Sequence, residues 1–392
     1  MNVVVVHNHY QLRGGEDQVF ADEVHLLEAH GHRVLPYTVH NAQLASKNSL
    51  GMAKATLWNG EIYRDLRTLL KREQPRLVHF HNVFPLISPA AYYAARAEGI
   101  PVVQTLHNYR LLCPNSLFFR DGHACEDCLD KFIPWPGVIH ACYRGDRAAS
   151  GVVATMLTTH RLLRTWTQMV DVYVTPSEFA REKFIQGGLP SEKIVVKPNF
   201  VHPDPGAGEG GGGYVLFVGR LSVEKGLNTL LTAWERLGTR IPLKIVGDGP
   251  MADRVIEAAE RLRCVEWQGH RPPEEVGTLM GEASLLVFPS ECYETFGRAA
   301  IEAFAKGTPV VAANLGAHAE LVDHGRTGLH FRPGNPKDLA TQVEWALSHP
   351  AELAQMRREA RAEFEVKYTA EQNYRKLLEI YESAVAHAKT RL

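Results

Sequence analysis

The stretch LLVFPSECYETFGRAAIEAFAKG, residues 285–307, contains a predicted strand, a polar turn and a predicted helix. Its first five residues form a short apolar run, which is typical of a strand buried in a parallel sheet. Its last ten residues are rich in helix formers and end at a glycine, which commonly terminates helices. Glu294 lies on the turn, and Glu302 falls on the second turn of the helix. The unpaired amides at the helix start, near Phe296 and Gly297, favour an anion.

Two acids that flank an anion-binding helix start restrict the class of ligand. A simple anion would be repelled by the carboxylates, so the ligand must also carry hydroxyl groups that the carboxylates can bind. A sugar attached to a diphosphate and a ribose has both features.

The same alternation of short apolar runs and helical stretches covers the rest of the chain. Strands that alternate with helices form parallel, doubly wound sheets. We therefore predict an α/β fold with two Rossmann-like domains that face a central cleft. The predicted strands lie at residues 3–6, 33–38, 77–81, 101–107, 172–176, 194–198, 214–219, 242–247, 265–269, 285–289, 309–313 and 328–331.

The length of 392 residues exceeds what one hydrophobic core normally serves, so two domains are expected. The stretch DPGAGEGGGG, residues 204–213, is rich in glycine and is the predicted linker. We predict an N-terminal domain over residues 1–203 and a C-terminal domain over residues 204–370. A last helix, residues 371–392, is expected to pack back on the first domain.

Composition excludes several classes of protein. Hydrophobic residues make up 45% and charged residues 22% of the chain, as in soluble globular proteins. The net charge of −1 argues against a nucleic-acid-binding protein. The first residues show no signal peptide, and no apolar run approaches the ~18 residues of a membrane span. A cytoplasmic location is therefore expected.

Polar and glycine-rich clusters follow the predicted strands directly, where ligands of parallel sheets bind. One cluster, GRLSVEKG (residues 219–226), places Arg220 and Lys225 on one strand-to-helix loop, and both cations suit phosphate oxygens. A solvated surface pair is the alternative. Another cluster, RGGE, holds Gly14 and Gly15 before a helix and allows close approach of a ligand, although an ordinary turn also fits.

Taken together, these motifs resemble the retaining glycosyltransferases of family four (group 1), which have the GT-B fold. ETFGRAAIE carries the E-x7-E pattern of that family, and GRLSVEKG carries its phosphate-binding loop. The motifs RGGE, HNYR, IVGDGP and KPNF occur in the family's order. The resemblance covers nearly the whole chain and implies transfer of a sugar from a nucleotide-diphosphate donor to a glycan or lipid-linked acceptor.

The resemblance also implies roles for single residues. Glu294 would bind donor-sugar hydroxyls, Glu302 would bind the ribose, and Arg220 with Lys225 would neutralise the diphosphate. His107 resembles the family's donor-sugar histidine. The other residues implied in donor binding are Gly14, Gly15, Thr295, Phe296 and Gly297, and Arg271 is a candidate for contact with the base.

The sequence has no Asp-x-Asp pair to hold a divalent metal on the diphosphate. Two cations and a helix N-terminus can stabilise a leaving phosphate instead, so no cofactor is expected for the chemistry. Two alternatives remain open at this point. One is a nucleotide-sugar epimerase or sugar phosphorylase of the same fold, and the other is a two-domain ligand-binding protein without enzymatic activity.

A cysteine-rich insertion occupies residues 113–142 of the predicted N-terminal domain. Four thiols in a cytosolic protein, two of them in a C-x2-C spacing, suggest a structural zinc ion more than disulfides. Four buried small hydrophobic side chains are the alternative reading. The four cysteines are Cys113, Cys125, Cys128 and Cys142.

Residues 47–76 carry an excess of positive charge. An anionic acceptor at the inner membrane face would be attracted by it, which predicts peripheral membrane contact, and a solvated helix face is the alternative. The cations are Lys47, Lys54, Arg64, Arg67, Lys71, Arg72 and Arg76, against the acids Glu61, Asp65 and Glu73.

Overall fold

The computed structural model describes residues 1–11, 14–42 and 49–389, which form two compact units. Lys47 of the predicted basic stretch lies outside the described residues. The N-terminal unit combines Met1–Phe118, Glu126–Pro198 and the chain from Asn373 onward, and the C-terminal unit combines Phe119–Cys125 with Asn199–Gln372. The division thus falls before the glycine-rich stretch, and one segment of the cysteine-rich insertion groups with the C-terminal unit.

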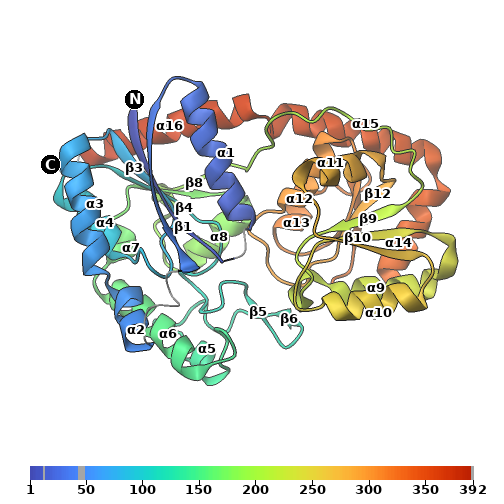
Figure 1. Cartoon of the computed structure of the whole chain (residues 1–392), viewed down its shortest axis with the longest axis horizontal. Coiled ribbons are helices and arrows are strands. Elements are labelled where there is room, and N and C mark those ends of the chain that lie inside the picture. Colours follow the sequence, from blue (N-terminus) through green and yellow to red (C-terminus); the bar gives the residue numbers. More distant parts are fainter. Residues whose placement is uncertain (12–13, 43–48, 390–392) are drawn as a thin grey trace. The chain divides into compact units, whose positions relative to one another are not determined.

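The N-terminal unit contains a six-stranded sheet in the order β2-β1-β3-β4-β7-β8 (Figure 1). All of its strand pairs are parallel. The strands are β1 (Asn2–His9), β2 (Arg33–His40), β3 (Leu77–Asn82), β4 (Val102–Thr105), β7 (Val172–Thr175) and β8 (Ile194–Val196). The helices are α1 (Gly15–Ala29), α2 (Ser49–Leu57), α3 (Gly60–Glu73), α4 (Ala90–Ala97), α5 (Trp135–Ile139), α6 (Arg147–Leu162), α7 (Thr165–Gln168), α8 (Glu178–Gln186) and α16 (Ala370–Lys389).

The C-terminal unit repeats this architecture with the strand order β11-β10-β9-β12-β13-β14, again with parallel pairs throughout. The strands are β9 (Val215–Val218), β10 (Leu243–Val246), β11 (Val265–Gly269), β12 (Leu285–Phe288), β13 (Val310–Ala313) and β14 (Gly328–Phe331). The helices are α9 (Leu227–Leu237), α10 (Ala252–Arg261), α11 (Pro273–Glu282), α12 (Arg298–Ala305), α13 (Ala317–Leu321), α14 (Pro336–Ser348) and α15 (Pro350–Lys367). A short hairpin of β5 (Phe119–Arg120) and β6 (His123–Ala124) completes the strands.

All twelve predicted strands are confirmed, and so is the fold of two parallel α/β sheets. The strands lie in long apolar runs because both faces of a parallel sheet are covered by helices. In β9, for example, Val215 and Phe217 contribute to one buried cluster and Leu216 contributes to another. The helices are stabilised mainly by burying their apolar sides against the sheet.

The glycine-rich stretch is packed against the C-terminal unit rather than suspended as a linker. The amide of Gly208 donates to the carbonyl of Lys306 at 2.9 Å, and that of Gly210 donates to Gly281 at 2.9 Å. A Cβ atom on Gly208 would lie 2.3 Å from the Cα of Gly281. Glycine is therefore required at this position by close backbone packing.

The last helix, α16, packs on the N-terminal unit. Leu377, Ile380 and Tyr381 belong to the same buried cluster as Val3 and Val5 of β1. Within the described chain, no helix combines the length and the apolar character needed to cross a bilayer.

Candidate active site

The turn after β12 brings together the two residues that sequence reasoning placed on separate loops. Lys225 ends the loop after β9, and Glu294 lies on the turn between β12 and α12. Because β9 and β12 are neighbours in the sheet, their carboxyl ends hold these loops side by side. The Nζ of Lys225 donates a hydrogen bond to Oε1 of Glu294, and the hydroxyl of Ser290 donates to the same oxygen at 3.0 Å.

Each member of this pair keeps the other charged. Burial raises the pKa of Glu294, but Lys225, His318 and the hydrogen bond from Ser290 together outweigh burial and hold this pKa below its ordinary value. Burial likewise opposes the charged form of Lys225, and the carboxylate of Glu294 raises the pKa of Lys225 above its ordinary value. The turn therefore presents a cation and an anion side by side near neutral pH.

Two glycines allow this approach of the loops. Gly226 has φ of +73°, and a Cβ atom there would lie 1.9 Å from the carbonyl oxygen of Pro289. Gly297 has φ of +147° and precedes α12. A Cβ atom there would lie 2.8 Å from the ring of Phe288. A side chain at either position would force the β9 loop away from the β12 turn or displace the start of α12.

The start of α12 carries the second acid of the E-x7-E pattern. Glu302 lies on the second turn, as predicted, and Oε1 accepts a hydrogen bond from Nε of Arg298 at 2.7 Å. The guanidinium of Arg298 therefore lies beside the carboxylate of Glu302, the residue that is expected to bind the ribose. The spacing of four residues places both side chains on the same helix surface.

A residue that sequence reasoning missed is His318, in α13. Its side chain is fully buried and packs on Phe288, with ring centroids 4.0 Å apart. Neither ring nitrogen has a hydrogen-bond partner among the described residues. Burial lowers the pKa of His318 to about 4. The carboxylate of Glu294 raises this pKa, whereas the ammonium of Lys225 lowers it further. No sequence signal marks it, because a lone histidine in a helix has many structural roles.

The remaining donor-site candidates of this unit also follow the carboxyl ends of its strands or precede α12, and they differ in exposure and in bonding partners. The side chain of Arg220 is exposed and forms no hydrogen bond or ion pair with the described residues. Thr295 lies on the turn beside Glu294, and Phe296 is buried in the core. Arg271 follows β11, at the far edge of the sheet, where its guanidinium pairs with Glu275 at 3.2 Å.

In the N-terminal unit, His107 ends a series of hydrogen-bonded side chains. Nε2 of His107 lies 2.9 Å from Nδ1 of His81, and Nε2 of His81 lies 3.3 Å from Oε2 of Glu23. Lys197 donates to the other oxygen of Glu23 at 2.6 Å. Burial raises the pKa of Glu23, but Lys197 and the imidazole of His81 outweigh burial and hold it well below its ordinary range.

The hydrogen bond between His81 and His107 needs one proton between the two facing nitrogens, so Nδ1 of His81 and Nε2 of His107 take opposite roles as donor and acceptor. Burial lowers the pKa of His107 well below its ordinary value, so its ring is neutral.

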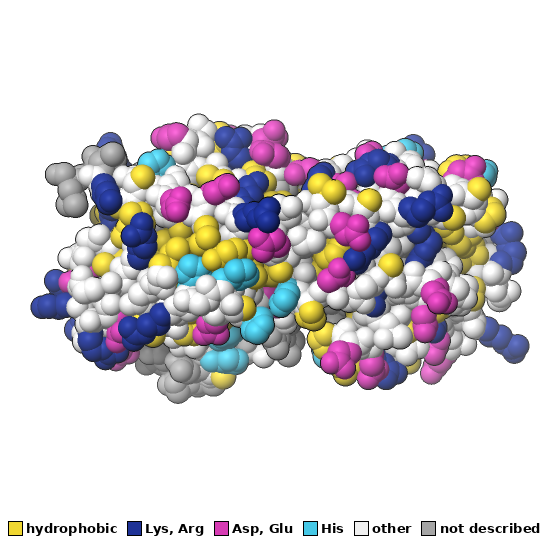
Figure 2. Space-filling view, turned by 90° about the horizontal axis from the view of Figure 1, so that it is seen from above, with side chains coloured by type: hydrophobic (Ala, Val, Ile, Leu, Met, Phe, Trp, Pro, Cys, Tyr) yellow, Lys and Arg dark blue, Asp and Glu magenta, His cyan; other side chains and the backbone are white. Residues whose placement is uncertain are grey.

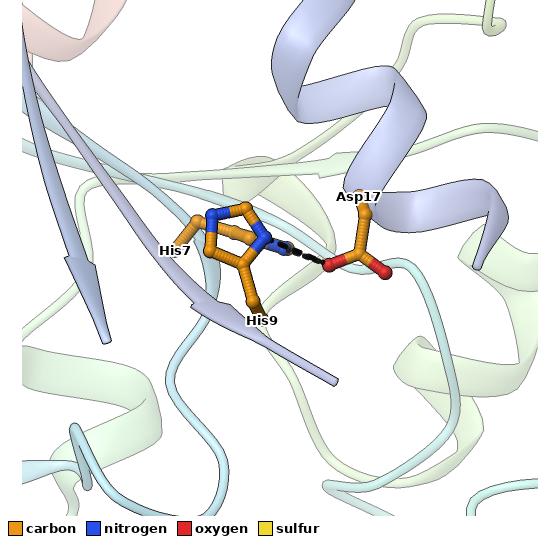
Figure 3. Close-up of side chains that lie close together, drawn as sticks. All are labelled: His7, His9 and Asp17. Carbon is orange, nitrogen blue, oxygen red and sulfur yellow. Dashed lines mark hydrogen bonds and ion pairs between the residues drawn. The ribbon is translucent and has the colours of Figure 1, made fainter. Parts of the chain in front are cut away.

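A second cluster lies at the end of β1. His7 and His9 both point toward Oδ1 of Asp17, at 2.9 Å and 3.0 Å (Figure 3). Histidine side chains also gather on the face of the N-terminal unit in Figure 2. Nδ1 of His7 is buried without a hydrogen-bond partner among the described residues.

Close packing among the described residues does not explain why the two positions beside this cluster are glycine. Gly14 donates its amide to Oδ2 of Asp17 at 2.7 Å. A Cβ atom on Gly15 would meet nothing within 4 Å. The next residue, Glu16, accepts from Nδ2 of Asn108 at 3.2 Å, and burial raises the pKa of Glu16 to about 7.

The four cysteines of the insertion are not gathered into one ligand group in the described chain. The clusters whose possible ligand atoms all lie within 4.8 Å of one another are His7, His9 and Asp17, and Glu23, His79 and His81. None of the cysteines forms a disulfide. Cys113 and Cys128 are buried, whereas Cys125 and Cys142 are half-buried. Zinc binding by these thiols stays a prediction.

Comparison with known proteins matches both halves of the chain to family models. Residues 13–205 match "Glycosyltransferase Family 4", and residues 205–363 match "Glycosyl transferases group 1". The 2-deoxystreptamine glucosyltransferase of Streptomyces kanamyceticus is 30% identical over 279 residues, which cover 67% of this chain and 66% of that protein. The glycogen synthase of Mycobacterium tuberculosis is 38% identical over 153 residues, covering 38% of this chain but only 37% of the relative.

The fold also agrees with solved structures. The Anabaena protein Alr3699/HepE, solved in complex with UDP-glucose, superposes with a TM-score of 0.70 at 18% identity. The match covers 98% of this chain and 100% of that one. Because the two family models run consecutively over the E-x7-E turn and the glycine pair, the chain belongs to glycosyltransferase family 4, group 1, with the GT-B fold.

Proposed function

We propose that the protein is a retaining glycosyltransferase that moves a sugar from a nucleotide-diphosphate sugar to a hydroxyl of a glycan or lipid-linked acceptor. The observation that carries this proposal is the Lys225–Glu294 pair beside the start of α12. A cation, a carboxylate and free helix amides in one place suit a ligand that has both phosphates and hydroxyls. The complex of the Anabaena protein with UDP-glucose supports a donor of this class.

The donor would be held by residues of the C-terminal unit. Glu294 accepts hydrogen bonds from sugar hydroxyls, and Lys225 contacts the diphosphate while it stays paired with Glu294. Glu302 accepts from the ribose hydroxyls once Arg298 shares its carboxylate or moves aside. Arg220, exposed on the same loop as Lys225, adds a second cation for the phosphates. His107 would contribute from the N-terminal unit, where its ring is hydrogen-bonded to His81.

In the transfer step, the acceptor oxygen forms a bond to the anomeric carbon, and the bond from that carbon to the diphosphate oxygen breaks. The proton of the acceptor hydroxyl passes to the leaving phosphate. Negative charge therefore grows on the phosphate, where Lys225, Arg220 and the N-terminus of α12 stabilise it. No divalent metal is needed for this step.

A ligand screen followed by a turnover assay tests the proposal. Nucleoside diphosphates and their sugars are added to the protein, and those that bind the folded state raise its melting temperature. The nucleotide sugar with the largest shift is then incubated with the protein, and release of nucleoside diphosphate is measured. Release of diphosphate, with transfer to water or a saccharide, is expected. Binding without any turnover indicates a ligand-binding protein, and conversion to an isomeric nucleotide sugar indicates an epimerase.

A further inference from the structure

Six large apolar side chains of the N-terminal unit are exposed within one stretch of the chain, residues 132–163. We call them the apolar patch, and each is 52–68% exposed. They lie just before α5, within α5, and at the carboxyl end of α6. The patch consists of Phe132, Ile133, Trp135, Ile139, Leu162 and Leu163.

Contacts between α6 and the preceding segment make the patch continuous. Nη1 of Arg161 donates to the carbonyls of Lys131 at 2.6 Å and Phe132 at 2.8 Å, which ties the carboxyl end of α6 to the start of the segment before α5. At the other end, Nε of Arg147 donates to the carbonyl of Ile139 at 3.2 Å. The segment from Lys131 to Ile139 therefore runs along α6 in the opposite direction. Figure 1 shows α5 beside α6.

The patch is bordered by positive charge. Residues 131–164 contain one acid, Asp146, whose carboxylate accepts from the amide of Ala149 at 2.6 Å and caps α6. The same residues contain five cations, of which Arg144, Arg147 and Arg164 are exposed. The other two are Lys131, which pairs with Asp130 at 3.1 Å, and the half-buried Arg161.

We propose that the apolar patch inserts into the interfacial layer of a bilayer that carries anionic headgroups. This layer takes up tryptophan, phenylalanine and aliphatic side chains, and its anionic headgroups attract cations near them. A second copy of the chain fits less well, because a two-fold contact would set the same five cations against themselves. The inference differs from the basic stretch at residues 47–76, where Arg67 is paired with Glu98 and Arg72 with Glu73.

Vesicle binding tests the inference with the full chain. Sedimentation is measured with vesicles of phosphatidylcholine alone and with vesicles that contain 30% phosphatidylglycerol, prepared with and without brominated acyl chains. The wild type is expected to bind the anionic vesicles at least tenfold more strongly, with quenching of tryptophan fluorescence by bromine. High salt is expected to weaken this binding, because it screens the cations.

The test variant carries Phe132→Ser, Ile133→Ser and Trp135→Ser together. A matched control carries Trp345→Ser and Val366→Ser, two exposed apolar residues of the C-terminal unit. The test variant should lose at least tenfold in partitioning and most of the quenching, whereas the control should stay within twofold of wild type. Equal loss in both variants, or equal binding to both vesicle types, overturns the inference. So does a wild-type dimer in light scattering that becomes a monomer in the test variant. Unchanged melting temperatures show that both variants fold.

Discussion

Lys225 and Glu294 lie 69 residues apart in the sequence and share a hydrogen bond at the carboxyl edge of one sheet. The neighbouring strands β9 and β12 create this pair, and Gly226 permits it, because any side chain there would collide with Pro289. In the function that we propose, the pair supplies a cation for phosphate and a carboxylate for sugar hydroxyls before any ligand arrives. Such preorganised groups can stabilise charge that develops in the transition state.

Removal of divalent metal tests the role given to Lys225 and Arg220. Brief treatment with EDTA should leave nucleoside diphosphate release within twofold of the untreated protein, because the two cations and α12 stabilise the leaving phosphate. Loss of activity that magnesium or manganese restores would show that the phosphate is stabilised by a metal ion. Loss only after long treatment, reversed by zinc, would point to the cysteines.

Metal analysis tests the zinc prediction directly. If Cys113, Cys125, Cys128 and Cys142 bind zinc, protein purified without chelator should contain about one zinc ion per chain. Changing Cys125→Ser and Cys128→Ser together should remove it, whereas Cys264→Ser serves as a control outside the insertion. A metal-free protein whose thiols all react with a thiol reagent would leave the cysteines as small hydrophobic side chains.

Gly15→Ala separates a ligand role of the glycine pair from a packing role. The added methyl meets nothing within 4 Å, so the melting temperature should change by no more than about 2 °C. If a ligand approaches this backbone, turnover should fall at least tenfold. Gly31→Ala is the control for an alanine in the turn after the same helix, where φ is +75°, and should lower stability rather than specific turnover. Full turnover in Gly15→Ala would remove the pair from the site.

Glu16 should make stability depend on pH. Its pKa is raised from 4.5 to about 7 in the folded chain, so the folded state retains a proton that the unfolded state loses. As pH rises from 4.5 to 7, this residue therefore removes stability, on the order of 3 kcal/mol, and little more is lost above pH 7.

The variant Glu16→Gln should lack this contribution, so its melting temperature relative to wild type should rise between pH 4.5 and 7. Glu28→Gln, an exposed change on the same helix, should show no such trend. A parallel shift of both variants at every pH would contradict a raised pKa for Glu16.

Much of the fold was predictable from the sequence, because twelve apolar runs are buried on both faces of their sheets. The motifs after β1, β4, β9 and β12 could also be found, since ligand loops follow the strands of parallel sheets. The series Lys197–Glu23–His81–His107 could not be predicted, because it joins four elements far apart in the sequence. The burial of His318 and the apolar patch also depend on packing, since no sequence pattern tells an exposed Trp135 from a buried one.

The turnover of Glu294→Gln compared with that of Glu291→Gln tests the central claim most directly. Both acids lie on the β12 turn, but Glu291 accepts from the hydroxyl of Thr229 at 2.6 Å and has no contact with Lys225 among the described residues. With a saturating nucleotide sugar, Glu294→Gln should lower kcat by a factor of about 100 or more, as loss of a group that acts on the transition state does. Glu291→Gln should stay within about threefold of wild type, and both should melt as folded proteins. An unchanged kcat in Glu294→Gln, or an equal loss in both variants, would contradict the assignment of Glu294 to the donor site.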